Sequence, residues 1–199
     1  SPQQPVNGIY NGDVRVDIKV VDPLVGGTYS GLKKVWYEVK NLGGVTQSGT
    51  LYEFTETDPK QEELLQVWSG GITVDSKLNN SNDVEIIVYA QDNSLNSSDK
   101  SVDIKIDITK PTIRVSYDNN TPDSGTYFMK ERVATVVVTE RNFDPKDITA
   151  TITNTDGVIP AISGFTKIKE GSGNQDDTEW MATIRYAADG DYTFDIGYT

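Results

Sequence analysis

Residues 89–111 read YAQDNSLNSSDKSVDIKIDITKP, and this stretch decides how the rest of the chain is interpreted. Within residues 101–108 the apolar side chains alternate with polar ones; they are Val102, Ile104, Ile106 and Ile108. Because successive side chains of a strand point to opposite faces, this period of two predicts a strand with one buried face and one wet face. Residues 109–111, ending in Pro111, interrupt the pattern, and a new alternating run begins at residue 112. We therefore predict a boundary between two β domains at this point.

Similar runs occur throughout the chain. In the first half they predict strands at residues 14–20, 32–40, 72–74, 83–91 and 101–108, with a loop at 41–49 and one short helical turn at 59–66. In the second half they predict strands at residues 112–117, 132–139, 147–154, 179–186 and 191–198. Turn signals recur every 8–12 residues or so, and no helical segment separates the strands, which is typical of a β-sandwich.

Length and composition agree with two folded β domains. The chain has 199 residues, of which 36% are hydrophobic. That length suits two domains of about 100 residues, each able to bury a core. We predict β-sandwich domains at residues 1–109 and 110–199. Pro111 restricts the backbone of Lys110 toward extended conformations, so we expect limited bending at the joint.

The charge and the missing residue types exclude several function classes. A net charge of -12 argues against binding to nucleic acid or to an anionic membrane, since both require a basic surface. The chain has no cysteine, so disulfides and thiolate metal sites are impossible, and it has no histidine, the commonest general base and metal ligand. No apolar run approaches the roughly 18 residues that a membrane-spanning helix needs.

The two halves can be laid over each other. Residues 8–10 (GIY) parallel residues 125–127 (GTY), and residues 83–89 parallel residues 191–197. The offset of roughly 110–120 residues indicates a duplicated domain. In this overlay Thr199 falls opposite Gln91, so the second half has no counterpart of residues 92–108. We therefore expect the second domain to lack its last strand, with the natural protein continuing beyond it.

Three short segments resemble bacterial Ig-like repeats. Residues 92–96 (DNSLN) look like their D-N-x-x-N loop, and residues 107–111 (DITKP) look like their D-x-T-x-P linker. Residues 188–194 (ADGDYTF) resemble the turn and corner tyrosine that open strand F of Ig-type domains. These repeats occur in series along surface and secreted proteins, mostly of Gram-positive bacteria.

The resemblance implies structural roles for several residues. The Tyr192 hydroxyl is expected to bond to upstream backbone, and Phe194 takes the place of a cysteine in antibody domains. Trp36 is expected to be a core tryptophan on strand C, and Trp180 is expected to fill the second core. The first half has Val84 where the second has Tyr192, so no corner bond is expected there.

Two kinds of binding site are weighed against structural roles. Exposed aromatic residues on a β-sandwich can stack on sugars. Trp68, which is followed by three small residues, and Tyr52 are the candidate residues for binding a glycan or a host protein. Calcium takes oxygen ligands, and Asp92, Asn93 and Asn96 form the preferred candidate site. Further candidate loops contain Asp118, Asn119, Asn120 and Asp123, and Asp176, Asp177 and Glu179. The same residue types equally stabilise turns.

Catalysis is not expected. A carboxylate pair for glycoside hydrolysis could be drawn from Glu56, Asp58, Glu62 and Glu63, but a solvated charged loop explains them as well. No nucleophile elbow, phosphate loop or dinucleotide fingerprint is present.

The resemblance implies a non-catalytic spacer or stalk of a larger extracellular protein, such as an adhesin anchored at a bacterial cell wall. Neighbouring Ig-like domains are the expected partners, with no cofactor required. The alternatives are a module that binds carbohydrate or a host protein, and an accessory β-domain of a polysaccharide-degrading enzyme.

Overall fold

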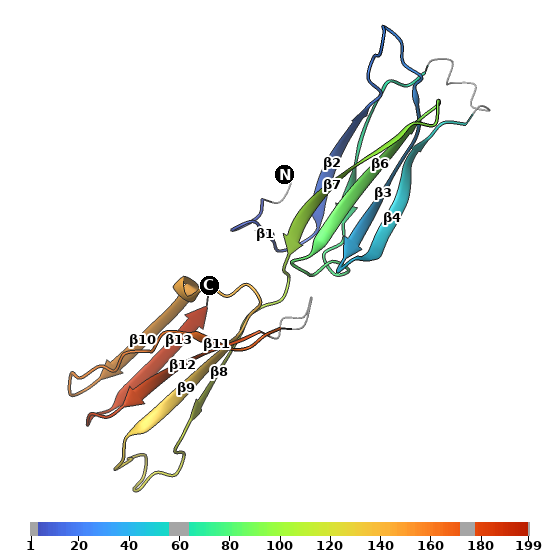
Figure 1. Cartoon of the computed structure of the whole chain (residues 1–199). Helices are drawn as coiled ribbons and strands as arrows, with labels where there is room; N and C mark the ends of the chain where they lie inside the picture. The colour runs from blue at the N-terminus through green and yellow to red at the C-terminus, as the bar shows by residue number, and fades with distance from the viewer. Residues whose placement is uncertain (1–3, 56–63, 172–177, 199) are drawn as a thin grey trace. The chain divides into compact units, whose positions relative to one another are not determined.

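The computed structural model describes residues 4–55, 64–171 and 178–198. The chain divides into two compact units, Ser1–Ile108 and Thr109–Thr199, which we call the first unit and the second unit. Among the described residues the regular structure consists of β strands and one 3-10 turn, η1 (Pro145–Asp147) (Figure 1). The protein is therefore all-β, as the alternating runs predict.

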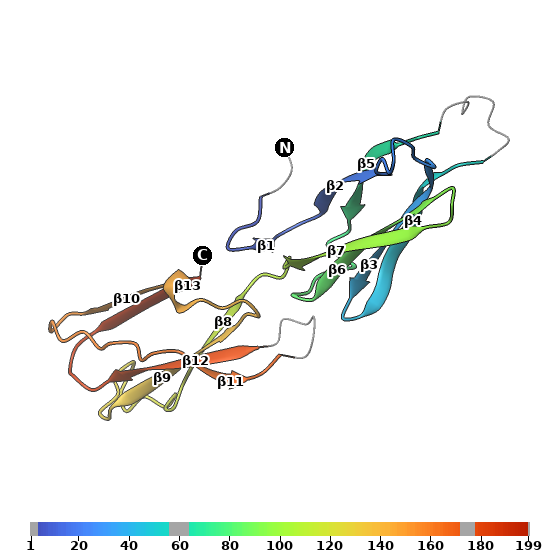
Figure 2. The same ribbon diagram turned by 45° about the horizontal axis from the view of Figure 1, so that its top comes forward.

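The first unit contains two sheets. The larger has the order β1 (Ile9–Tyr10), β7 (Ser97–Ile106), β6 (Val84–Asp92), β3 (Leu32–Asn41) and β4 (Gly44–Glu53). The smaller pairs β2 (Val14–Val21) with β5 (Val67–Val74). Figure 2 shows β2 and β5 as a layer separate from β3, β4, β6 and β7.

Both layers contribute to the first core. Its buried side chains are Val14 and Ile18 of β2, Ile72 and Val74 of β5, Val39 of β3, Val84 and Ile86 of β6, and Ile106 of β7. They occupy alternate positions of their strands, so the period of two in the sequence places them between the sheets. This unit is therefore a β-sandwich whose core is closed from both sides.

The second unit also contains two sheets. Four strands follow the order β11 (Thr166–Lys169), β12 (Glu179–Tyr186), β9 (Arg132–Thr139) and β8 (Thr112–Tyr117). A two-stranded sheet pairs β10 (Ile148–Asn154) with β13 (Tyr192–Tyr198), which lie side by side in both views (Figures 1 and 2).

In the second core, the fully buried side chains all come from one of the two sheets. Its fully buried members are Ala134, Val136 and Val138 of β9 and Ile184 of β12, all in the four-stranded sheet. No residue of β10 or β13 is fully buried, although Phe194 and Ile196 of β13 pack against this core. The β10–β13 sheet therefore covers the core without being covered itself.

Strands with clean alternation match their predicted bounds. The structure places β8, β9 and β12 at the predicted residues, β10 and β13 begin one residue later than predicted, and β6 is shifted by one residue at both ends. The strand predicted at residues 101–108 is confirmed only in part, because β7 begins at Ser97 and ends at Ile106. Ile106 is fully buried, but Val102 is 49% exposed and Ile108 is 38% exposed. The opposing sheet has only two strands, so it covers only part of β7.

Other predictions for local structure are wrong. The predicted loop at 41–49 is a tight turn followed by β4, and β5 begins at Val67 instead of residue 72. Strand β11 was not predicted. The sequence pattern of β4 and β5 is weakened by glycines, namely Gly44, Gly49, Gly70 and Gly71. Pairing with β3 and β2 stabilises these two strands despite their low strand propensity. The predicted helical turn lies mostly outside the described residues.

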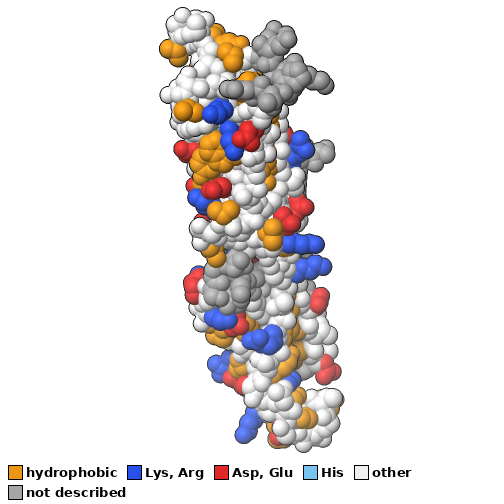
Figure 3. All heavy atoms as spheres, turned by 90° about the vertical axis from the view of Figure 1, so that its right-hand side faces the viewer, with side chains coloured by type: hydrophobic (Ala, Val, Ile, Leu, Met, Phe, Trp, Pro, Cys, Tyr) orange, Lys and Arg blue, Asp and Glu red, His pale blue; other side chains and the backbone are white. Residues whose placement is uncertain are grey.

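Figure 3 shows Lys and Arg side chains interspersed with Asp and Glu over the visible face. Negative charge is in excess over the chain, yet both signs occur across this face. Such mixed surfaces favour solubility over binding to a polyanion.

Candidate functional site

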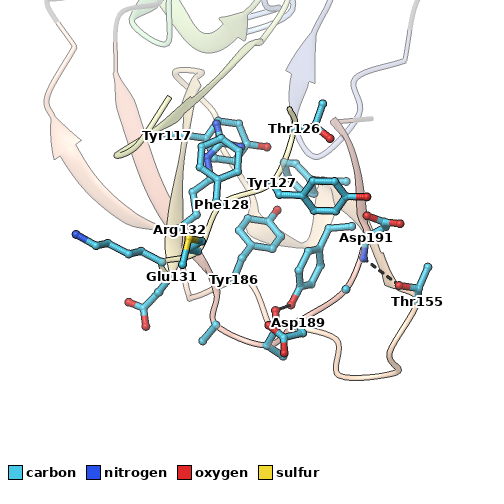
Figure 4. Close-up of a pocket in the computed structure, with 17 residues that line it drawn as sticks. Tyr117, Thr126, Tyr127, Phe128, Glu131, Arg132, Thr155, Tyr186, Asp189 and Asp191 are labelled. Carbon is cyan, nitrogen blue, oxygen red and sulfur yellow. Dashed lines mark hydrogen bonds between the residues drawn. The ribbon is translucent and has the colours of Figure 1, made fainter. Parts of the chain in front are cut away.

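The candidate site is an aromatic pocket at one end of the second unit. Its volume is about 720 Å³. The rings that line it belong to Tyr117, Tyr127, Phe128, Tyr186, Tyr192 and Phe194, and Figure 4 shows several of them gathered around the opening. Tyr117 ends β8, Tyr186 ends β12 and Tyr192 begins β13. Antiparallel neighbours bring such strand ends together, which is why residues distant in sequence form one site.

Arg132, the first residue of β9, fastens one wall of this pocket. Its guanidinium carbon lies 3.8 Å from the ring centre of Tyr117 and 4.2 Å from that of Phe128. Its Nε donates to the carbonyl of Asn119 at 2.6 Å. These cation–π contacts and the hydrogen bond hold the loop that follows β8 against the strand end.

Tyr186 and Tyr192 form the adjoining wall, where the ring centre of Tyr186 lies 6.4 Å from that of Tyr117. Their ring centres are 4.9 Å apart with an edge-to-face angle of 71°. Burial, followed by the neighbouring Tyr117 phenol, raises the pKa of Tyr186 to about 12. The Tyr186 phenol is therefore neutral at physiological pH, and this wall offers apolar ring surface to an occupant.

The hydrogen bond predicted for the corner tyrosine is confirmed. The Tyr192 hydroxyl donates to the carbonyl of Ala188 at 2.7 Å. Phe194, two residues later, packs against the second core as expected from its position. Pro111 directly precedes β8.

The candidate binding residues Trp68 and Tyr52 belong to different sheets of the first unit. Trp68 lies on β5 of the smaller sheet, whereas Tyr52 lies on β4 of the larger one. Trp68 is half-buried and packs against the first core. Its indole covers Gly70, where a Cβ would lie 2.5 Å from the ring atom Cζ2. Trp68 therefore acts as a packing residue of the first unit.

The prediction that Trp36 fills the core is wrong. Its neighbours on β3, Val35 and Tyr37, face inward, so Trp36 faces outward, where it stacks on Tyr89 at 5.2 Å with a 9° angle. The Tyr89 hydroxyl donates to Glu38 at 3.1 Å. Strand alternation decides this outcome, because Val35 and Val39 already occupy the core side.

Trp180 contributes to the second core through an aromatic neighbour. It shares the inward face of β12 with Ala182 and Ile184, and its ring stacks on Phe143 at 5.0 Å. Its indole N–H donates to the carbonyl of Glu140 at 3.3 Å. Phe143 in turn packs against the buried residues of β9 and β12. Trp180 is therefore a packing residue at the edge of this core.

The predicted calcium loop is closed by its own hydrogen bonds. Asp92 accepts from the Asn96 backbone and side-chain nitrogens, each at 2.8 Å. Asn93 Nδ2 donates to the carbonyl of Ser30 at 3.0 Å. Burial favours a higher pKa for Asp92, but the hydrogen bonds from Asn96 outweigh it and lower the pKa. These contacts explain the three residues as a stabilised hairpin turn.

In the loop that contains Asp118 and Asp123, the carboxylates also accept hydrogen bonds from the backbone. Asp118 accepts from the Val133 backbone, and Asp123 accepts from the Met129 backbone. In the part of the chain that the structure describes, no group of three or more acidic side chains is placed to hold a metal ion. Asp176 and Asp177, and the candidate carboxylates Glu56, Asp58, Glu62 and Glu63, lie outside the described residues.

Sequence reasoning missed Arg132 and Tyr186. The available signal was their position, since both stand at the ends of strands that were predicted correctly. Only the pairing of those strands shows that these ends meet.

Comparison with known proteins does not identify a family. The sequence matches no protein-family model, and no curated protein is significantly similar to it. No helix within the described residues is long and apolar enough to cross a membrane.

Proposed function

We propose that the chain consists of two tandem Ig-like β-sandwich repeats that act as a non-catalytic spacer in a larger bacterial extracellular or surface-anchored protein, such as an adhesin. The second repeat follows the plan of the first, and its described residues include no counterpart of β7. The function is mechanical: each repeat adds length and resists unfolding under tension.

The observation that carries this proposal is the pairing of β1 with β7. These strands stand near the two ends of the first unit and run parallel, with Ile9 opposite Lys105 and Tyr10 opposite Ile106. The Asp107 N–H adds a 2.8 Å hydrogen bond to the carbonyl of Tyr10. Tension applied at the ends of this unit pulls the two strands in opposite directions along their length. Their hydrogen bonds are then loaded together in shear instead of opening one at a time.

Equivalent pairings support duplication. Trp68 of β5 stands opposite Val20 of β2, and Trp180 of β12 stands opposite Val138 of β9. Each tryptophan therefore occupies the same place in its unit. The pair β3–β6 matches β10–β13 in the same way, with Asn41 opposite Val84 and Asn154 opposite Tyr192.

Features of the second unit support the Ig-like assignment. The corner tyrosine bond of Tyr192 occupies the start of β13, where the resemblance predicts it. Phe194 follows as a core residue on the same strand.

Single-molecule pulling on the full chain tests the mechanical role. Asp107→Pro removes the N–H that bonds to Tyr10, while the extended backbone of Ile106 tolerates a following proline. Asp107→Ala is the matched control, because it removes the side chain but keeps the N–H. We expect two unfolding events in the unmodified chain, and a lower unfolding force for the first unit in Asp107→Pro than in Asp107→Ala. Equal forces in these two variants would contradict the proposal.

Glycan binding is the second candidate function, favoured by the outward-facing stack of Trp36 on Tyr89. Flat aromatic surfaces of this kind can bind sugar rings. A glycan array comparing the unmodified chain with Trp36→Ala separates the two candidates. Glycan binding by the unmodified chain that is lost in Trp36→Ala would favour a glycan-binding module over a passive spacer.

A further inference from the structure

One edge of β13 has no strand partner among the described residues. In the first unit, β6 pairs with β3 on one side and with β7 on the other. In the second unit, the equivalent strand β13 pairs with β10 alone. An unpaired edge presents backbone donors and acceptors that are able to bind another strand.

The register shows which core positions depend on the absent strand. Ile86 stands opposite Val39, and Phe194 stands opposite Ile152, so Phe194 takes the place of Ile86. Ile86 is 1% exposed, whereas Phe194 is only half-buried. The apolar face of β13 is therefore less covered than the same face of β6.

The aromatic pocket adjoins this edge. In the first unit, Val84 pairs with Ile104 of β7, and Ile106, two residues further, is completely buried. Tyr192 takes the place of Val84 in the second unit, and it lines the pocket. A strand added to β13 in the register of β7 would therefore direct its counterpart of Ile106 toward the pocket.

The other side of the pocket repeats a further contact of β7. In the first unit, Tyr10 pairs with Ile106 in parallel. The matching segment of the second unit, by the sequence overlay, contains Tyr127, which lines the pocket and is 68% exposed. Met129 beside it is 86% exposed. Large apolar side chains around an open pocket are characteristic of a site that is filled by a partner.

We propose that the free edge of β13 and the aromatic pocket form one acceptor site for an extended β strand with the apolar–polar alternation of β7, which none of the described residues supplies. This inference rests on the proposed tandem-repeat architecture. The strand runs antiparallel to β13 and alternates apolar with polar residues, as Ile104, Lys105 and Ile106 do. A β-branched apolar residue near its C-terminal end fills the pocket, and main-chain hydrogen bonds to β13 supply the rest of the recognition.

The edge of β10 is the weaker candidate for a missing strand. Its counterpart in the first unit, β3, is flanked by β4, which contributes no fully buried residue. By contrast, β7 contributes Ile106 to the centre of the core. Only the β13 side therefore explains the incomplete burial of the second core.

The test extends the chain after Thr199 with a second copy of residues 92–107, which supplies both the hairpin turn and the strand. Hydrogen exchange is then measured on peptides of β13 and of the pocket. We expect exchange in β13 to slow by about tenfold or more, and the pocket peptides to be protected as well. The matched control carries Ile104→Asp and Ile106→Asp in the appended copy only, and it should give no protection.

Two results would overturn the proposal. One is hydrogen exchange in β13 that is unchanged by the appended copy. If the extended chain aggregates, a synthetic peptide of residues 96–107 is added to the unmodified chain instead, and unchanged exchange in β13 has the same meaning. The other is a dimer of the unmodified chain, seen by light scattering, whose β13 protection disappears on dilution, because a second copy would then be the occupant. The pulling experiment on Asp107 concerns the first unit alone, so failure of either proposal can be recognised separately.

Discussion

The Tyr192 hydroxyl donates a 2.7 Å hydrogen bond to the carbonyl of Ala188, four residues earlier in the chain. This bond fastens the turn between β12 and β13 to the first residue of β13. The same side chain packs edge-to-face on Tyr186 and lines the aromatic pocket. One residue therefore connects the turn, the open edge and the pocket of the second unit.

Replacing Tyr192 with phenylalanine should destabilise the second unit by about 1 kcal/mol, the net contribution of a partly buried hydrogen bond. Hydrogen exchange across a urea titration reports each unit separately. Tyr127→Phe removes the same hydroxyl from a ring that is 68% exposed, so it should leave stability unchanged. Equal effects of the two substitutions would show that the bond to Ala188 contributes nothing.

Gly70 should not tolerate a side chain. Its Cβ would overlap the indole of Trp68, which packs against the first core and has little room to move. Gly70→Ala should therefore destabilise the first unit by about 1–3 kcal/mol, as overpacked core positions do. Gly44→Ala is the control, because a Cβ there approaches only the carbonyl of Asn41, at an ordinary 3.6 Å. A neutral Gly70→Ala substitution would mean that Trp68 is free to leave its position.

The stability of the first unit should depend on the ionised form of Asp13. The Ser76 N–H donates to its carboxylate at 2.9 Å and the Ser76 hydroxyl donates at 2.8 Å. The backbone bond, and then the hydroxyl, lower the pKa of Asp13 below its ordinary value of 3.8. A carboxyl whose pKa is lower in the folded state stabilises that state above the unfolded pKa. The contribution is lost as pH falls through the folded pKa.

Asp13→Asn should therefore lower the melting temperature of the first unit at neutral pH. It should also weaken the dependence of that temperature on pH below about 4. Calorimetry of the full chain across this range measures both effects. Asp17→Asn, at an exposed position of β2, is the control. If the melting temperature of Asp13→Asn depends on pH as that of the unmodified chain does, Asp13 is not the source of the acid sensitivity.

Calcium should have no effect on the hairpin at residues 92–96. Both carboxylate oxygens of Asp92 already accept hydrogen bonds from Asn96, so a cation would have to disrupt contacts that close the turn. The melting temperature of the first unit should be equal in EDTA and in roughly 1 mM calcium, where extracellular calcium modules are occupied. An increase in melting temperature that occurs with calcium, but not with magnesium and not in Asp92→Ala, would show that this loop binds calcium.

Local patterns predicted the fold class and the best strands. Strands β8, β9 and β12 begin and end where their alternation does. Tyr192 was also recognised, because its corner contact is made to a residue only four positions away. Strand β4 was missed, since its residues form a strand only when β3 supplies the pairing partner. The family resemblance predicts a core position for Trp36, although its alternation with Val35 and Tyr37 indicates the outer face.

The all-β class can be predicted from local patterns, since a period of two within each run is a property of neighbouring residues. The meeting of Arg132, Tyr117 and Tyr186 at one pocket, and the pairing of β13 on one side only among the described residues, appear only in the folded protein. These features arise from the pairing of strands far apart in the chain. Burial at a given position depends on the layer that covers it, and that layer cannot be inferred from the neighbouring residues in the sequence.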